Sequence, residues 1–160
     1  MNVKNKIKWK LFVPALLLPL AVGGLAALLT GGAMEDYSRL ARPPLSPPGW
    51  VFPAAWTLLY LLMGAASYLV AAAPVSAERK ERALCVYALQ LAVNLAWPVI
   101  FFKLSACGAA FFWLLLLLAL VWALRLLFKH IDPRAGKLLL PYLLWLLFAL
   151  YLNLGVWILN

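Results

Sequence analysis

The chain has 160 residues, of which 67% are hydrophobic, and it carries a formal net charge of +9. Soluble globular domains are usually about 45–50% apolar, so a water-soluble fold of this length has too little interior for these side chains. The composition therefore excludes a soluble domain and indicates a surface that largely faces lipid.

Five long apolar segments follow one another along the chain. About 20 apolar residues span the hydrocarbon core of a bilayer. Backbone polar groups in lipid must be satisfied within the chain, so such segments form helices, and the alternating pattern of a β-barrel is absent. We therefore predict an all-α integral membrane protein that forms one bundle of five transmembrane helices, at about residues 11–30, 51–73, 83–102, 104–128 and 138–159.

The first predicted helix follows a lysine-rich start, and Pro14 and Pro19 are expected to bend it. Such a start is also typical of a signal peptide, but this apolar run is longer than usual and no clear cleavage site follows. Residues 31–50 form the longest connection, and their dense prolines stiffen the backbone. We expect an ordered loop with a functional role, with a plain spacer as the alternative.

The third predicted helix has two contrasting faces. Ala88, Ala92 and Ala96 form a small-residue face, which lets another helix approach closely. Gln90 and Asn94 lie on the opposite side among aromatic residues. An unpaired amide is costly in hydrocarbon, so both side chains should face the bundle interior. There they either tie helices together or contribute to a ligand pocket.

The second and fifth predicted helices carry aromatic stripes at helical spacing. These stripes suit a flat, mostly apolar ligand that makes few polar contacts. Their members are Pro53, Trp56, Tyr60, Gly64 and Ser67, followed by Tyr142, Trp145, Ala149 and Asn153. We expect Gly64 and Ala149 to leave room for the ligand. Trp113 and Trp122 of the fourth helix lack polar neighbours, and we predict packing or lipid-facing positions for them.

Most of the 14 Lys and Arg residues lie before the first helix, between the second and third, and around the turn between the fourth and fifth. These regions share one side of the membrane, so the positive-inside rule predicts a cytoplasmic N-terminus and an outside C-terminus. The placement favours anionic lipid head groups as partners over nucleic acid. Cys85 and Cys107 are expected near opposite faces, too far apart for a disulfide.

Conventional catalytic chemistry has few candidates in this sequence. No predicted span contains Asp, Glu or Lys, which ion-coupled transporters and proton pumps usually need. His130, the single histidine, lies in a turn, and no paired carboxylates or metal-ligand cluster are present. We therefore predict no metal site and no required cofactor.

Several segments resemble the tryptophan-rich sensory/translocator protein (TspO/MBR) family, also called peripheral-type benzodiazepine receptors. They occur in the expected order and span residues 47–52, 56–60, 90–98, 141–145 and 152–153. The resemblance implies a five-helix bundle, usually a homodimer, and the alanine face of the third helix would form the dimer contact. It also implies a pocket beneath the loop between the first two helices.

Members of this family bind porphyrins such as protoporphyrin IX and other flat hydrophobic ligands, so the resemblance implies the same ligand class here. Some bacterial relatives are reported to promote light-dependent porphyrin breakdown, with tryptophans that match Trp56 and Trp145. The family resemblance and the polar and aromatic helix faces together predict a ligand site. Its residues are Tyr37, Trp56, Tyr60, Gln90, Asn94, Trp97, Phe101, Tyr142, Trp145 and Ala149.

The sequence also departs from the family pattern. Leu45 stands where many relatives have Trp, and Trp113 stands where many have an acid. Leu154 and Ile158 replace the two key residues of the animal sterol motif, so we expect a bacterial cytoplasmic membrane protein. Three functions stay open: a porphyrin receptor or carrier, an enzyme that degrades porphyrin through the two pocket tryptophans, and a dimeric membrane partner without a small ligand.

Overall fold

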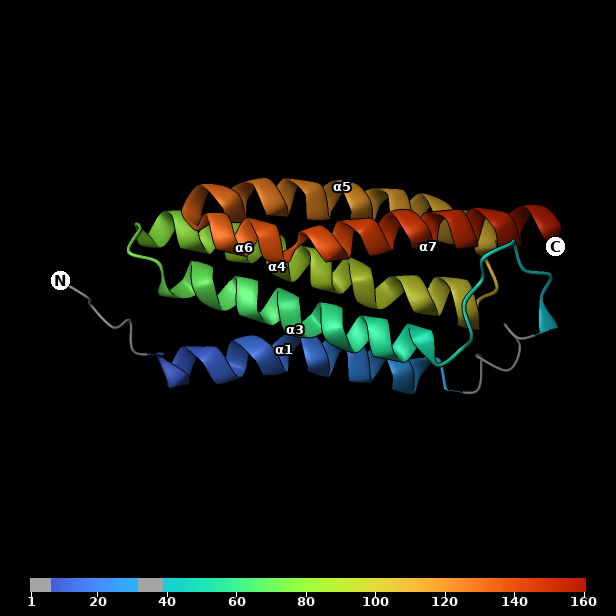
Figure 1. The fold of residues 1–160 in the computed structure, drawn as a ribbon, viewed down its shortest axis with the longest axis horizontal. Coiled ribbons are helices and arrows are strands. Elements are labelled where there is room, and N and C mark those ends of the chain that lie inside the picture. The colour runs from blue at the N-terminus through green and yellow to red at the C-terminus, as the bar shows by residue number, and fades with distance from the viewer. Residues whose placement is uncertain (1–6, 32–38) are drawn as a thin grey trace.

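The computed structural model describes residues 7–31 and 39–160, in which five long helices run side by side as a bundle (Figure 1). In chain order they are α1 (Trp9–Leu29), α3 (Val51–Ala72), α4 (Ala77–Pro98), α5 (Cys107–Ile131) and α7 (Leu140–Leu159). A short π-helical turn, η1 (Val99–Lys103), follows α4, and a short helix, α6 (Pro133–Leu138), precedes α7. Within the described ranges, five helical segments are long and apolar enough to cross a membrane, which confirms the predicted fold class.

The helix limits differ from the sequence expectation at both membrane sides. Helix α4 begins at Ala77 rather than near residue 83, because the charged residues that follow the turn continue the helix. Helix α5 begins at Cys107 rather than 104, since η1 and a turn at Ser105, with a φ of 51°, come first. The Asp132 carboxylate accepts a 2.8 Å hydrogen bond from the Arg134 backbone N–H and caps α6.

Helix α1 lies at one edge of the bundle, next to α3 (Figure 1), and it contacts α3 and α4. Gly64 permits the close approach of α1 and α3, because a Cβ atom there would lie 2.6 Å from the Ala15 carbonyl oxygen. The expectation that Gly64 leaves room for a ligand is therefore wrong. The backbone of α1 occupies that space instead.

Helices α4, α5 and α7 enclose much of the buried core, which includes Leu114, Leu117 and Tyr142. Trp113 ties two of these helices together, because its indole Nε1 donates a 2.8 Å hydrogen bond to the Val93 carbonyl oxygen of α4. Trp113 thus packs against the core, which is one of the two positions predicted for it, and its indole finds a backbone acceptor that the sequence did not indicate. Trp122, in contrast, is 53% exposed on the outer side of α5.

The proline-rich segment from residue 39 to 50 is attached to the end of α7. The Asn160 side-chain amide accepts from the Ala41 N–H and donates to the Ala41 carbonyl, both at 3.0 Å. The Tyr151 hydroxyl donates a 2.6 Å hydrogen bond to the Pro44 carbonyl oxygen. These bonds hold the loop across the end of the bundle that carries the C-terminus (Figure 1). Tyr37, a predicted ligand residue, lies outside the described residues.

Candidate functional site

A chain of buried hydrogen bonds joins α3, α4 and α7 in the interior. The Tyr60 hydroxyl donates to Asn94 Oδ1 at 3.1 Å, and Asn94 Nδ2 donates to the Tyr142 hydroxyl oxygen at 2.5 Å. The Tyr142 hydroxyl in turn donates to Gln90 Oε1 at 3.2 Å, and Gln90 Nε2 lies 3.7 Å from the Met63 sulfur. Both amides therefore face the bundle interior, where they tie three helices together.

Next to this chain lies a cavity of about 410 Å³ between α1, α3 and the end of α4. Small-molecule sites usually have volumes of about 300–1,000 Å³, so the cavity has a suitable size. Four predicted ligand residues line it: Trp56, Tyr60, Asn94 and Trp97. The remaining lining residues are Leu20, Gly23, Gly24, Ala26, Ala27, Thr30, Phe52, Pro53, Thr57, Pro98 and Phe102.

The cavity walls are mainly apolar and aromatic, with few free polar groups. The Trp56 ring lies against the Tyr60 ring, with centroids 5.5 Å apart. The hydroxyls of Thr30 and Thr57 bond to carbonyl oxygens of their own helices, those of Ala26 and Pro53. Trp97 Nε1 is buried and has no hydrogen-bond acceptor in the described part of the chain. A buried indole N–H usually has a partner, but this donor is unsatisfied, and it can bond a ligand acceptor only when the side chains that cover it move aside.

The other predicted ligand residues lie outside this cavity. Gln90 and Tyr142 are fully buried in the hydrogen-bond chain behind it. Phe101 and Ala149 border a separate space of about 20 Å³, which also touches Trp97. Trp145 packs edge-on against Phe52, with ring centroids 6.2 Å apart, and so reaches the cavity only through that ring.

Helix α1 supplies a wall that sequence reasoning missed. Its contribution comes from small residues, chiefly Gly23, Gly24 and Ala27, which look like an ordinary apolar run in the sequence. A Cβ atom at Gly23 would overlap the ring of Tyr60, whereas one at Gly24 would meet nothing within 4 Å. Two adjacent glycines inside an apolar helix were the available signal for a close approach, since glycine costs helix stability.

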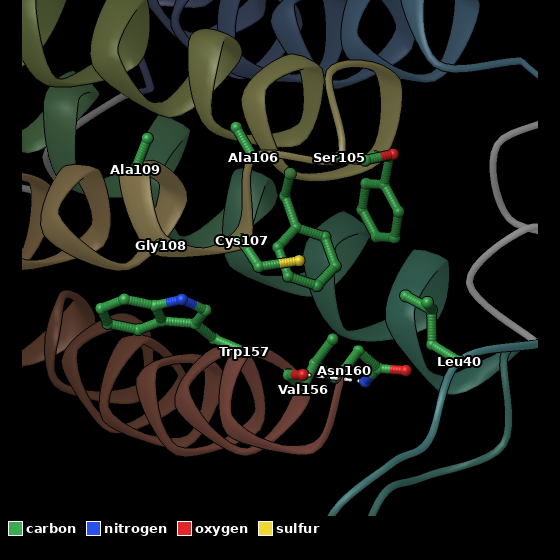
Figure 2. Close-up of a pocket in the computed structure, with 11 residues that line it drawn as sticks. Leu40, Ser105, Ala106, Cys107, Gly108, Ala109, Val156, Trp157 and Asn160 are labelled. Carbon is green, nitrogen blue, oxygen red and sulfur yellow. Dashed lines mark hydrogen bonds between the residues drawn. The ribbon is translucent and has the colours of Figure 1, made fainter.

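A second cavity of about 440 Å³ lies where the turn before α5 meets the end of α7 (Figure 2). Figure 2 shows Trp157 and Asn160 of α7 opposite the segment from Ser105 to Ala109. Only one predicted ligand residue, Phe101, lines it. The cavity between α1, α3 and α4 therefore matches the predicted site better.

Known proteins resemble this chain over most of its length. The sequence profile of the TspO/MBR family matches residues 15–158. The chain belongs to the TspO/MBR family. It is 38% identical over 152 residues to the tryptophan-rich sensory protein of Cereibacter sphaeroides, an alignment that covers 95% of this chain and 92% of that protein. This family contains the tryptophan-rich sensory and translocator proteins, which are membrane-embedded.

Two further relatives show how broad the similarity is. Protein CrtK of Rhodobacter capsulatus is 36% identical over 138 residues, which cover 86% of this TspO/MBR chain and 85% of that relative. The translocator protein of Homo sapiens is 39% identical over 128 residues, which cover 79% and 76%. Both a bacterial and an animal protein are thus similar to most of this chain.

The small-residue face of α4 lies away from the hydrogen-bond chain, as its spacing predicted. Ala88 and Ala92 are exposed and Ala96 is half-buried, whereas Gln90 and Asn94 are buried. The dimer contact assigned to this face stays a prediction. Cys85 and Cys107 are both free thiols in this TspO/MBR chain.

Proposed function

We propose that this TspO/MBR protein is a membrane receptor or carrier for flat, largely apolar ring molecules of the porphyrin class. The ligand binds in the cavity between α1, α3 and α4, and protoporphyrin IX is the representative ligand. The observation that carries the proposal is the placement of two indoles, Trp56 and Trp97, on the walls of one apolar cavity of suitable size. Relatives named as sensory and translocator proteins support a role in sensing or moving such a ligand.

The cavity chemistry matches this ligand class. Aromatic side chains offer flat apolar faces on which a conjugated ring stacks. The Tyr60 hydroxyl donates a hydrogen bond to the Asn94 side-chain oxygen, so the two residues hold the cavity wall rigid and add little polarity to it. Trp97 Nε1 supplies a donor for a carbonyl or carboxylate at the edge of the ligand.

A titration of protoporphyrin IX in the dark, followed by the porphyrin absorbance band, tests the proposal. We expect saturable binding that weakens at least about tenfold, or about 1.4 kcal/mol, in Trp97→Leu. Trp50→Phe is the matched control, because Trp50 is exposed at the end of the loop and lines none of the cavities described above. Equal affinity in the wild type and Trp97→Leu, or no saturable binding at all, contradicts the proposal.

A second candidate function is light-dependent oxidation of the bound porphyrin by dioxygen. It is favoured by Trp56, which lines the cavity and lies 5.5 Å from the Tyr60 ring and 6.0 Å from the Tyr142 ring. Trp56 and Tyr60 thus line the ligand cavity, and Tyr142 is a further oxidisable ring that contacts Trp56 from behind the cavity wall. Illumination in air tests this function: loss of the porphyrin band should slow in Trp56→Phe more than in Trp145→Phe. Equal rates in both variants and the wild type exclude the mechanism.

We also propose that the N-terminus is cytoplasmic, that the protein resides in a bacterial cytoplasmic membrane, and that two copies pair through Ala88, Ala92 and Ala96. The charge distribution and the exposed alanines support these assignments. Ala92→Leu should convert a dimer into monomers on size-exclusion chromatography in detergent. A dimer that persists places the contact elsewhere, and a reporter fused to the C-terminus tests the orientation.

A further inference from the structure

Arg125 is a charged residue placed within a membrane-spanning helix. It lies six residues before Ile131, the last residue of α5, which corresponds to about 9 Å along the helix axis. Helix α5 has 25 residues and a length of about 37 Å, only about 7 Å more than a typical hydrocarbon core. The backbone of Arg125 therefore lies inside the apolar layer when α5 spans the bilayer.

The side chain of Arg125 points deeper into that layer. Its Cζ atom lies 5.5 Å from the ring centroid of Trp122, which is one helical turn nearer the membrane centre. Trp122 is 53% exposed, so this cation–π pair lies on the outer, lipid-facing side of α5. An arginine near the membrane surface usually extends toward the head groups, and this one does not.

Arg125 has no anionic partner within the described part of the chain. Its Nε atom is buried and has no hydrogen-bond acceptor there. The two ion pairs of the described residues join Arg82 to Glu78 and Arg134 to Asp132, and neither includes Arg125. A guanidinium in an apolar layer needs a negative partner, and its planar set of N–H donors matches the oxygens of a phosphate.

Neighbouring residues complete a strip along the same helix face. Trp122, Arg125 and Lys129 follow the i, i+3, i+7 spacing of one helix side, and Lys129 is exposed one turn nearer the membrane surface. Leu126, also exposed, borders the strip. Along α5, the two cations thus lie nearer the membrane surface, and the aromatic ring lies nearer the membrane centre. A phospholipid has the same arrangement, with its charged head group at the surface and its acyl chains toward the centre.

We infer that Trp122, Arg125 and Lys129 form a binding site for the head group of one anionic phospholipid, in the leaflet next to the junction of α5 and α6. The phosphodiester accepts hydrogen bonds from the Arg125 guanidinium, Lys129 neutralises the remaining charge, and the acyl chains lie along the exposed side of α5. The acyl chains carry the phosphate to this depth, where a free phosphate ion has no favourable path.

Lipid retention on the full-length protein tests this site. The wild type, Arg125→Gln and Arg82→Gln are reconstituted in phosphatidylcholine vesicles that contain a minor fraction of phosphatidylglycerol, then released and examined by native mass spectrometry. We expect the wild type to retain about one more phosphatidylglycerol per chain than Arg125→Gln. Arg82→Gln is the control, because Arg82 is an exposed arginine in a surface ion pair, and it should retain as much as the wild type.

Thermal unfolding gives a second measurement of lipid binding. Phosphatidylglycerol should raise the thermal midpoint of the wild type most, that of Arg125→Lys less, and that of Arg125→Gln not at all. Equal lipid retention by the wild type and Arg125→Gln overturns the inference. So does a stabilisation that inorganic phosphate or phosphatidylcholine reproduces. If Arg125→Gln loses dimerisation and keeps its lipid, the partner of Arg125 is a second protein chain, and the lipid site is refuted.

Discussion

Filling the cavity from the α1 side should weaken ligand binding without disturbing the fold. Ala27 is an exposed residue of α1 that lines the cavity, and Ala21 is an exposed residue of the same helix that does not. An apolar space of about 150 Å³ accommodates a benzene ring. A phenyl group at position 27 would therefore take up roughly a third of the 410 Å³ available between the helices.

We expect Ala27→Phe to weaken protoporphyrin IX binding by at least about tenfold, equivalent to about 1.4 kcal/mol. Ala21→Phe makes the same substitution on a surface away from the cavity, so its affinity should equal that of the wild type. Dark titration of the porphyrin absorbance band measures both variants, and circular dichroism checks that the helical content is unchanged. Equal affinities for Ala27→Phe and Ala21→Phe would refute the placement of the ligand in this cavity.

Three further predictions concern stability. Asn94→Leu removes the acceptor of the buried Tyr60 hydroxyl and one of the two partners of the Tyr142 hydroxyl, which keeps Gln90. We therefore expect the free energy of unfolding to fall by about 1–3 kcal/mol on denaturant unfolding, whereas Thr57→Val, at an exposed site, should change little. Gly64→Ala should lower the thermal midpoint, because its Cβ meets the α1 backbone. Gly24→Ala should raise the thermal midpoint, since alanine stabilises a helix by up to about 1 kcal/mol relative to glycine and the added Cβ meets nothing. A lower thermal midpoint for Gly24→Ala than for Gly64→Ala would contradict this packing. Hydrogen bonds from Arg134 lower the pKa of Asp132 below its ordinary 3.8. The contribution of Asp132 to the free energy of unfolding is therefore present above that pH and is lost as the pH falls. Asp132→Asn should flatten this acid dependence of the free energy of unfolding, and an unchanged pH profile would exclude the cap.

Much of the fold could be predicted from the sequence because lipid leaves few alternatives. Long apolar runs must be helical, and an amide such as Asn94 must find a partner in the interior. The spacing of Gln90 and Asn94 therefore gave the correct face of α4. The same reasoning did not give the start of α4 at Ala77, because charged residues continue a helix beyond the apolar layer without any apolar signal.

The candidate site was harder to predict because periodicity identifies a helix face and not what that face meets. Trp56 and Trp145 have equivalent positions in their stripes, yet only Trp56 lines the cavity. Gly64 looked like space for a ligand, and the neighbouring backbone fills it. The wall from α1 carries no polar or aromatic residue to mark it, so Ala27 could be recognised only from the packed structure.

The location of the ligand is tested most directly by an experimental structure of the protein saturated with protoporphyrin IX in the dark. We expect the porphyrin ring to lie between α1 and α3 and to contact Trp56 and Trp97, with a polar group of the ligand within hydrogen-bond distance of Trp97 Nε1. A porphyrin bound at the second cavity near Trp157, on the outer surface of the bundle, or nowhere at saturation would contradict this placement.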